Sequence, residues 1–108
     1  MLEESVEIFK ALSDENRITI FKLLTQGELC VCDIIENLDL TQPTVSHHLK
    51  VLYQAELIHV EKRGKWKYYS INDEKVIKIK QFFEMILNKE LDIEVKRSNT
   101  DCDGKRKV

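Results

Sequence analysis

Apolar residues recur every three or four positions through the first half of the chain, which is the spacing of amphipathic helices. This pattern predicts four helices: one that ends near residue 12, one over about 18–24, one over about 31–38 and one over about 41–55. Ser13 is expected to cap the second helix and Thr41 the fourth, because side-chain oxygens accept hydrogen bonds from the free amides of a first turn. Gly27 is expected to end the second helix, because glycine adopts positive φ without steric cost.

The second half begins with a different period, in which apolar and polar residues alternate. Residues 58–62 and 66–71 are rich in β-branched and aromatic side chains and flank a glycine-containing turn, so they predict a β-hairpin. Asp73 is expected to cap a last, long helix whose apolar residues recur as far as Leu91. The element order α-α-α-α-β-β-α is that of a mainly α, winged helix-turn-helix fold, in which the hairpin is the wing.

We expect one DNA-binding and dimerisation domain over residues 1–95 and a flexible polar tail over 96–108. A chain this small gains stability from an oligomeric partner, and the first and last helices have more apolar residues than its own core needs. The sequence therefore predicts a homodimer in which the last helix packs against the first through Phe83, Ile86, Leu87, Leu2, Val6 and Phe9.

The net charge of −2 is unevenly distributed along the chain. Residues 1–40 carry nine acidic and three basic residues, whereas residues 41–80 carry four acidic and eight basic residues. The basic surplus lies over the predicted fourth helix and hairpin, where contacts with DNA phosphates would need it. No apolar run is long enough to cross a membrane and no signal-like segment opens the chain, so a cytoplasmic protein without membrane contact is expected.

The fourth helix has the polar face that reading the major groove of double-stranded DNA requires. The hydrogen-bonding residues at its early and outward positions are predicted to contact DNA: Gln42, Thr44, Ser46, His47, His48 and Lys50. The hairpin adds four cations suited to phosphates or the minor groove: Lys62, Arg63, Lys65 and Lys67. The alternatives are the solvated face of an ordinary amphipathic helix and a solvated charged turn.

Cys30 and Cys32 lie one residue apart directly upstream of this helix. Thiolates bind soft ions such as As(III), Sb(III), Cd(II) and Pb(II) in preference to Mg²⁺ or Ca²⁺. In a straight α-helix residues i and i+2 point about 200° apart, so a shared ion requires non-helical backbone at the start of the third helix. The alternative, two buried cysteines that act as small apolar residues, is disfavoured by the acidic residues around them.

Cys102, between two aspartates in the tail, is the candidate third thiolate, from the same subunit or from a partner. A stray exposed thiol is the alternative. Three cysteines in a cytosolic chain favour metal or redox chemistry over a disulfide framework. His47 and His48 point about 100° apart on a helix and so do not share an ion, which leaves DNA contact as their predicted role.

Residues 28–34, 46–52 and 68–71 resemble the arsenic-sensing repressors of the ArsR/SmtB family, and the resemblance covers about residues 5–90. It implies a homodimeric winged-helix repressor that leaves its operator when a metalloid or metal binds. Members of the arsenite branch carry a third cysteine at the position of Ile35, and the cadmium and lead sensors add cysteines from an N-terminal extension that this chain lacks. The zinc sensors bind between their last helices; Asp73 matches one ligand, but the other positions are Lys75, Ile86 and Lys89, so that site is not expected.

Together these features predict a repressor, not an enzyme, that releases operator DNA when As(III) or Sb(III) is captured by Cys30, Cys32 and Cys102. Three thiolates satisfy the trigonal geometry of As(III), whereas a tetrahedral ion wants a fourth ligand. Two alternatives stay open: a Cd(II)- or Pb(II)-responsive repressor that adds Asp33 or a water, and a repressor that senses oxidation of the thiols. A thiol oxidoreductase would need Cys-x-x-Cys in a βαβ pattern, and neither is present.

Overall fold

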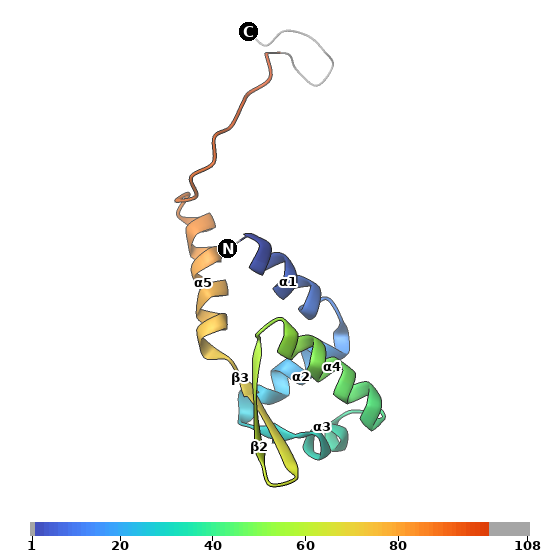
Figure 1. The fold of residues 1–108 in the computed structure, drawn as a ribbon. Helices are drawn as coiled ribbons and strands as arrows, with labels where there is room; N and C mark the ends of the chain where they lie inside the picture. Colours follow the sequence, from blue (N-terminus) through green and yellow to red (C-terminus); the bar gives the residue numbers. More distant parts are fainter. Residues whose placement is uncertain (1, 100–108) are drawn as a thin grey trace.

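The computed structural model describes the backbone of residues 2–99 and the side chains of residues 4–99. Its helices and strands follow the predicted order with two additions, the short helix η1 and the strand β1 (Figure 1). The elements are α1 (Leu2–Leu12), α2 (Glu15–Leu23), η1 (Leu24–Gln26), β1 (Leu29–Cys30), α3 (Val31–Asn37), α4 (Gln42–Gln54), β2 (Ile58–Arg63), β3 (Trp66–Ile71) and α5 (Asp73–Leu87). The predicted winged helix-turn-helix fold is thereby confirmed, with α3 and α4 as the helix-turn-helix and β2–β3 as the wing.

Side-chain caps fix where two of these helices begin. Asp14 caps α2, because its Oδ1 accepts from two backbone N–H groups of the first turn at 2.8 and 3.1 Å. The prediction that Ser13 is this cap is wrong: Ser13 Oγ donates to a carbonyl oxygen at the end of α1, at 2.8 Å. The neighbouring carboxylate carries the negative charge that a helix N-terminus favours. Thr41 caps α4 as predicted, and its Oγ1 accepts from a backbone N–H at 3.4 Å.

The core lies where α2, α3 and α4 meet the start of the wing. The side chains of Ile20 in α2, Ile34 in α3 and Leu52 in α4 are fully buried. The inward face predicted for α4 is confirmed, since Val45 and Leu49 are buried with Leu52. This shared core fixes α4 against the other two helices, so that its opposite face points away from the protein.

The wing is part of a three-stranded antiparallel sheet in the order β1-β3-β2. Gly64 has a φ of 62° in the two-residue turn between β2 and β3, a conformation that suits glycine. Strand β1, which the sequence did not predict, pairs Leu29 with Tyr69 and Cys30 with Tyr68. The segment that carries the first cysteine is therefore hydrogen-bonded to the wing.

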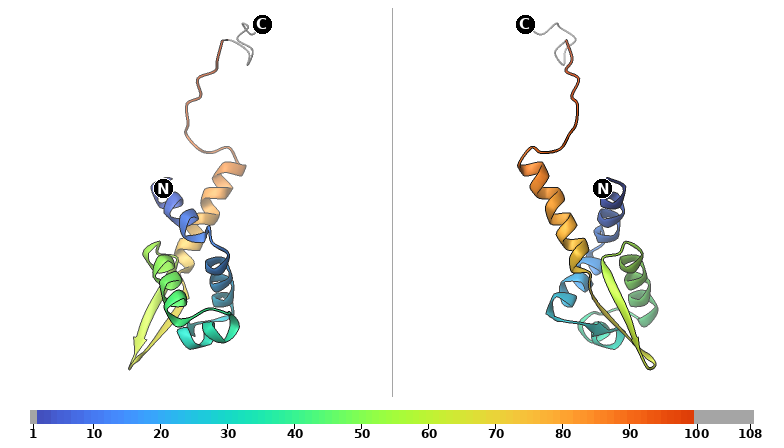
Figure 2. Two further views of the ribbon diagram at one scale, coloured as in Figure 1. Left: turned by 90° about the vertical axis from the view of Figure 1, so that its right-hand side faces the viewer. Right: turned by 60° about the vertical axis from the view of Figure 1, so that its left-hand side comes forward.

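Helix α5 leads away from the helix-turn-helix, and α1 is its neighbour (Figure 2). The rings of Phe9 on α1 and Phe83 on α5 have centroids 6.0 Å apart. The prediction that this helix continues to Leu91 is wrong, because it ends at Leu87 and Lys89 has a φ of 58°. A left-handed residue just after a helix turns the chain out of the helical path.

Candidate nucleic-acid interface and thiol site

A groove of about 730 Å³ separates the helix-turn-helix from the wing. Its walls combine the cysteine pair with residues predicted to contact DNA: Cys30 and Cys32 at the start of α3, Gln42, Ser46 and Lys50 on α4, and Lys65 and Lys67 on the wing. Trp66 and Tyr69 of β3 add an aromatic wall. The expected thiol site and the expected DNA-binding residues thus line the same groove.

Five of the six α4 residues that the sequence predicts to contact DNA are exposed in the structure. The five exposed residues are Gln42, Thr44, Ser46, His47 and Lys50. Thr44 Oγ1 lies 2.9 Å from the hydroxyl oxygen of the cap residue Thr41, so this side chain also supports the start of the helix.

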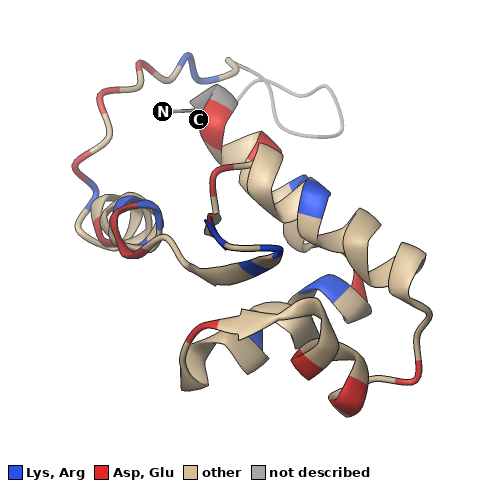
Figure 3. Cartoon of the chain, turned by 60° about the horizontal axis from the view of Figure 1, so that its bottom comes forward, with Lys and Arg blue, Asp and Glu red and all other residues tan. Residues whose placement is uncertain are grey.

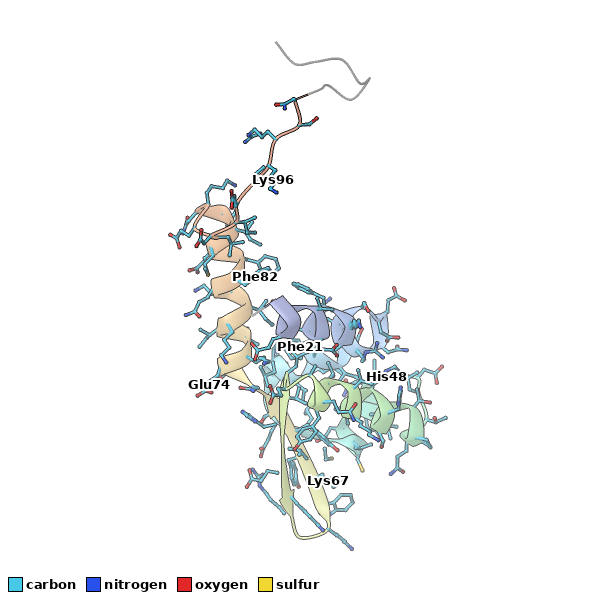
Figure 4. The ribbon with its side chains drawn as sticks, turned by 45° about the horizontal axis from the view of Figure 1, so that its top comes forward. Phe21, His48, Lys67, Glu74, Phe82 and Lys96 are labelled. Atoms are coloured by element: carbon cyan, nitrogen blue, oxygen red, sulfur yellow. The ribbon has the colours of Figure 1, made fainter. Side chains whose placement is uncertain are left out.

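His48 departs from the expected DNA contact, because only 7% of it is exposed. Figure 4 labels it on α4, and its Nδ1 lies 3.3 Å from Nη1 of Arg17 on α2. A guanidinium only donates, so Nδ1 accepts and the proton of the neutral ring is on Nε2. Burial lowers the pKa of His48, and the Asp14 carboxylate opposes this shift. The ring therefore joins α4 to α2 and is not part of the DNA face.

Three of the four wing cations are exposed, and none of them forms an ion pair with an acidic residue among residues 4–99: Lys62, Lys65 and Lys67. Figure 4 labels Lys67 on the hairpin, and Figure 3 colours the acidic and basic residues along the chain. Arg63 differs, because its guanidinium is paired with Glu28 and Glu61. The hydrogen bonds that Arg63 donates to Glu61 and to Glu28 raise the pKa of Arg63 above its usual range.

The cysteine pair spans the boundary between β1 and α3. Cys30 precedes the helix with extended backbone, φ −90° and ψ 172°, and Cys32 lies in the first turn. Cys30 therefore has the non-helical backbone that an ion shared by the two cysteines would require. Both cysteines are free thiols in the structure; Cys30 is half-buried and Cys32 is exposed.

Asp33 is the immediate partner of Cys30. Its Oδ2 accepts from the backbone N–H of Cys30 at 3.0 Å and from the thiol at 3.3 Å. Burial raises the pKa of the Cys30 thiol, and the hydrogen bond from that thiol to the Asp33 carboxylate raises it further, while backbone N–H donors lower it. The resting form of Cys30 is therefore the protonated thiol.

A third ligand is absent from this part of the chain. Among residues 4–99, no three His, Cys, Asp or Glu side chains are arranged to hold a metal ion. Cys102, the predicted third thiolate, lies outside the described residues.

On α5, Lys75 is buried, with Nζ 3.2 Å from an oxygen of Glu56 and 3.8 Å from one of Glu4. This ammonium is therefore paired with carboxylates from other segments of the chain.

The sequence analysis did not identify two residues that hold side chains of this region in place. Arg17 holds His48, and its Nε donates to a carbonyl oxygen of α1 at 2.6 Å. Glu28 holds Arg63 across 35 positions of sequence. Local patterns carry no signal for either pair, because the partners lie far apart in the chain.

A three-helix core, a polar outward face on α4 and a basic wing beside it define a winged helix-turn-helix regulator that binds DNA. The model of the bacterial regulatory protein, arsR family, matches residues 14–60. The chain belongs to the ArsR family, and it is a transcriptional regulator rather than an enzyme. No helix among the described residues has both the length and the apolar character needed to cross a membrane.

Relatives support this assignment over most of the chain. An uncharacterized HTH-type transcriptional regulator of Methanocaldococcus jannaschii is 46% identical over 78 residues, 71% of this chain and 88% of that protein. The arsenical resistance operon repressor of Bacillus subtilis is 44% identical over 77 residues, 70% of this chain and 73% of that protein. A cadmium resistance transcriptional regulatory protein CadC homolog of Staphylococcus aureus is 44% identical over 71 residues, 65% of this chain and 59% of that protein.

A solved structure extends the similarity to three dimensions. The homodimeric winged helix-turn-helix domain of Mb0332 from Mycobacterium bovis, described as a possible ArsR-family regulator, superposes with a TM-score of 0.66. It is 26% identical, and the match covers 90% of each chain. The region that matches includes the elements that line the groove.

Proposed function

We propose that this protein is an As(III)- and Sb(III)-responsive repressor, which binds operator DNA as a homodimer in the cytoplasm and releases it when its thiols capture the metalloid. The observation that carries this proposal is the groove, because the cysteine pair and the DNA-facing residues line the same space. The similarity to an arsenical resistance operon repressor supports the choice of metalloid.

Capture of the metalloid is a ligand exchange. Each thiol gives its proton to one hydroxyl of As(OH)₃, an As–S bond forms, an As–O bond breaks and water leaves. Cys30 and Cys32 supply two of the three sulfurs that trigonal As(III) accepts, and Cys102 is proposed as the third. Asp33 accepts from the Cys30 thiol before capture, and this hydrogen bond is lost when the sulfur binds arsenic.

DNA binding uses the other walls of the groove. Gln42, Ser46 and His47 are proposed to meet base edges in the major groove, with Thr44 and Lys50 beside them. Lys62, Lys65 and Lys67 are proposed to contact phosphates from the wing. Arg63 and His48 are left out of this set because both are held by other residues of the protein.

Homodimerisation is proposed through α1 and α5. Val6, Phe9 and Phe83 are each more than 40% exposed, and Leu87 is 74% exposed. An apolar surface of this kind on a small domain is buried by a symmetric partner, and the related Mb0332 domain is homodimeric.

The test is operator release by arsenite, followed by fluorescence anisotropy of labelled operator in reducing buffer. Cys30→Ser and Cys32→Ser are expected to bind operator as the unmodified protein does and to stay bound when arsenite is added. Cys102→Ser is expected to keep a partial response, since a tail thiol adds affinity but lies outside the β1–α3 boundary. Release of the Cys30→Ser variant at the same arsenite concentration as the unmodified protein would contradict the proposed inducer site.

A Cd(II)- or Pb(II)-responsive repressor is the second candidate, supported by the cadmium resistance relative and by the Asp33 carboxylate beside Cys30. Titrating the same release with Cd(II), Pb(II) and Zn(II) separates the candidates. Release by Cd(II) at lower concentration than by As(III) would favour the second one. Release by Zn(II) alone would exclude both.

A further inference from the structure

Arg63 lies at the end of β2, where the wing turns, and its charge is held by a network within the protein. Its Nη1 donates to Oε1 of Glu28 at 2.5 Å, and its Nη2 donates to Oε2 of the same carboxylate at 3.0 Å. Nη2 also donates to Glu61 at 2.9 Å, and the guanidinium lies 4.7 Å from the ring centroid of Tyr68. Two carboxylates and an aromatic face therefore surround one cation.

The position of Glu28 gives this network its significance. Glu28 immediately precedes β1, and two residues later Cys30 pairs with Tyr68 of β3. In the sheet order β1-β3-β2, strands β1 and β2 are separated by β3. The Glu28–Arg63 ion pair therefore links the residue before β1 directly to the end of β2, although these two strands are not neighbours in the sheet.

Single ion pairs on a protein surface contribute little to stability, because water screens them and two long side chains lose freedom. The Glu28–Arg63 pair has the bidentate geometry in which both guanidinium and carboxylate are fixed in orientation. Stacking on Tyr68 fixes the guanidinium from a third side. The contact therefore fixes the position of Arg63 relative to Glu28.

We propose that the Glu28–Arg63 ion pair couples the thiol site to the wing, so that inducer capture at Cys30 and Cys32 displaces the wing lysines from DNA. This inference rests on the proposed function. A metalloid shared by residues 30 and 32 draws the end of β1 toward the first turn of α3. Glu28 moves with β1, Arg63 moves with Glu28, and the turn that carries Lys65 directly follows Arg63.

The test is Glu28→Gln, which keeps the size of the side chain and removes its charge. Glu61→Gln is the matched control, because it removes the other carboxylate partner of Arg63 but leaves the link to β1. Operator binding is measured by anisotropy without arsenite and at saturating arsenite, and arsenite binding to the free protein by calorimetry. For Glu28→Gln we expect the affinity for operator without arsenite, and the affinity of the free protein for arsenite, to stay within about twofold of the unmodified protein. The factor by which arsenite weakens operator binding is expected to be at least about fivefold smaller. Glu61→Gln is expected to keep the full weakening.

Arg63→Lys provides a second variant, since it keeps the charge but loses the bidentate geometry, and the same reduced weakening is expected. Circular dichroism melting shows whether each variant is folded. Full arsenite-induced weakening in both folded variants overturns the coupling role. Tighter operator binding by Glu28→Gln with a salt slope larger by about 1 also overturns it, because Arg63 would then be a phosphate contact withheld by Glu28. If the unmodified protein binds operator and arsenite does not release it, the proposed function itself is contradicted.

Discussion

At the scale of single residues, His47 and His48 show how neighbouring identical side chains take different roles. His47 is exposed on the outward face of α4, whereas His48 is buried against Arg17 of α2. The two ring centroids are only 5.8 Å apart, so the roles differ because the side chains point to different sides of α4. His48 must stay neutral to accept from Arg17, which makes the packing of α4 on α2 sensitive to protonation.

His48 is expected to make stability fall in acid. Burial lowers its pKa in the folded protein, so the unfolded chain binds more protons, and stability is lost as the pH falls below the unfolded pKa of about 6.5. His48→Gln, whose side-chain oxygen also accepts but does not titrate, should flatten the fall in melting temperature between about pH 7 and pH 5. The control is His47→Gln, which should behave as the unmodified protein. The same acid-induced loss in His48→Gln would show that other groups cause it.

Asp33 is expected to slow the reaction of Cys30 with electrophiles. Its charge and its hydrogen bond from the thiol both raise the pKa of Cys30. In a Cys32→Ser background, where Cys30 is the reacting thiol of the pair, Asp33→Asn should increase the rate of iodoacetamide alkylation at neutral pH, because a lower pKa raises the fraction of the reactive thiolate. Burial stays the same in both proteins, so the increase is partial. Mass spectrometry gives the rate, and an unchanged or slower rate would contradict this role of Asp33.

At the scale of elements, the wing combines a predicted hairpin with a strand of two residues. Strand β1 adds two register pairs to β3, and these fix the cysteine segment against the wing. The base of the wing is fixed as well, since Leu57 and Ile58 are buried in the core. The basic tip therefore extends from a supported base.

Lys65 and Gln42 are expected to contribute to DNA binding in different ways. Lys65→Ala should weaken binding to all sequences about equally and lower the salt slope by about 1, as the loss of one phosphate contact does. Gln42→Ala should instead reduce the preference for operator over random DNA, by about 1–3 kcal/mol if it reads a base. The control is Lys22→Ala, on the exposed side of α2, which should change neither quantity. Unchanged affinity and salt slope in Lys65→Ala would exclude the wing tip as a DNA contact.

The helices and the hairpin were predictable because each repeats its period over several residues. Strand β1 was not, because two residues do not define an alternation, and its pairing with Tyr68 and Tyr69 is a long-range contact. The end of α5 was misplaced because Leu91 continues the helical spacing after the backbone has turned at Lys89.

The residue types of the candidate site were predictable from the sequence. The directions in which individual side chains point were harder to predict. The backbone at Cys30 followed from the geometry that two thiols one residue apart would require. Arg63 and His48 were assigned to DNA on charge and position, but each is held by a partner from a distant segment, Glu28 and Arg17 respectively. A single sequence gives no signal for such pairs.

At the scale of the whole molecule, many of the exposed large apolar residues lie on α1 and α5, apart from Tyr53, Val60 and Trp66, which line the groove. Val76, Ile77 and Phe83 of α5 are between 37% and 51% exposed, and Val6 and Phe9 of α1 are 44% and 42% exposed. A regulator that reads two half-sites needs its two DNA-binding units at a fixed separation, and pairing of these helices would set it.

Phe83→Glu is expected to give a monomer that binds operator at least about a hundredfold more weakly, since one half-site is lost. The physical reason is the cost of burying an unpaired carboxylate in an apolar interface. Sedimentation velocity at micromolar concentration measures the oligomeric state, and circular dichroism shows that the variant is folded. The control is Gln81→Glu, which places the same charge at an exposed position of α5. A Phe83→Glu protein that sediments as the unmodified protein does would place the interface elsewhere.

Trp66, the single tryptophan of the sequence, lies on the wall that β3 gives to the groove and is 49% exposed. Indole emission shifts to shorter wavelength when water leaves the ring, so the intrinsic fluorescence of Trp66 should report changes at the groove. Operator binding should shift the emission, and arsenite should change it separately if the wing moves. In Cys30→Ser the operator signal should remain and the arsenite signal should vanish. Unlabelled protein would then allow the order of inducer capture and DNA release to be followed in real time by stopped flow.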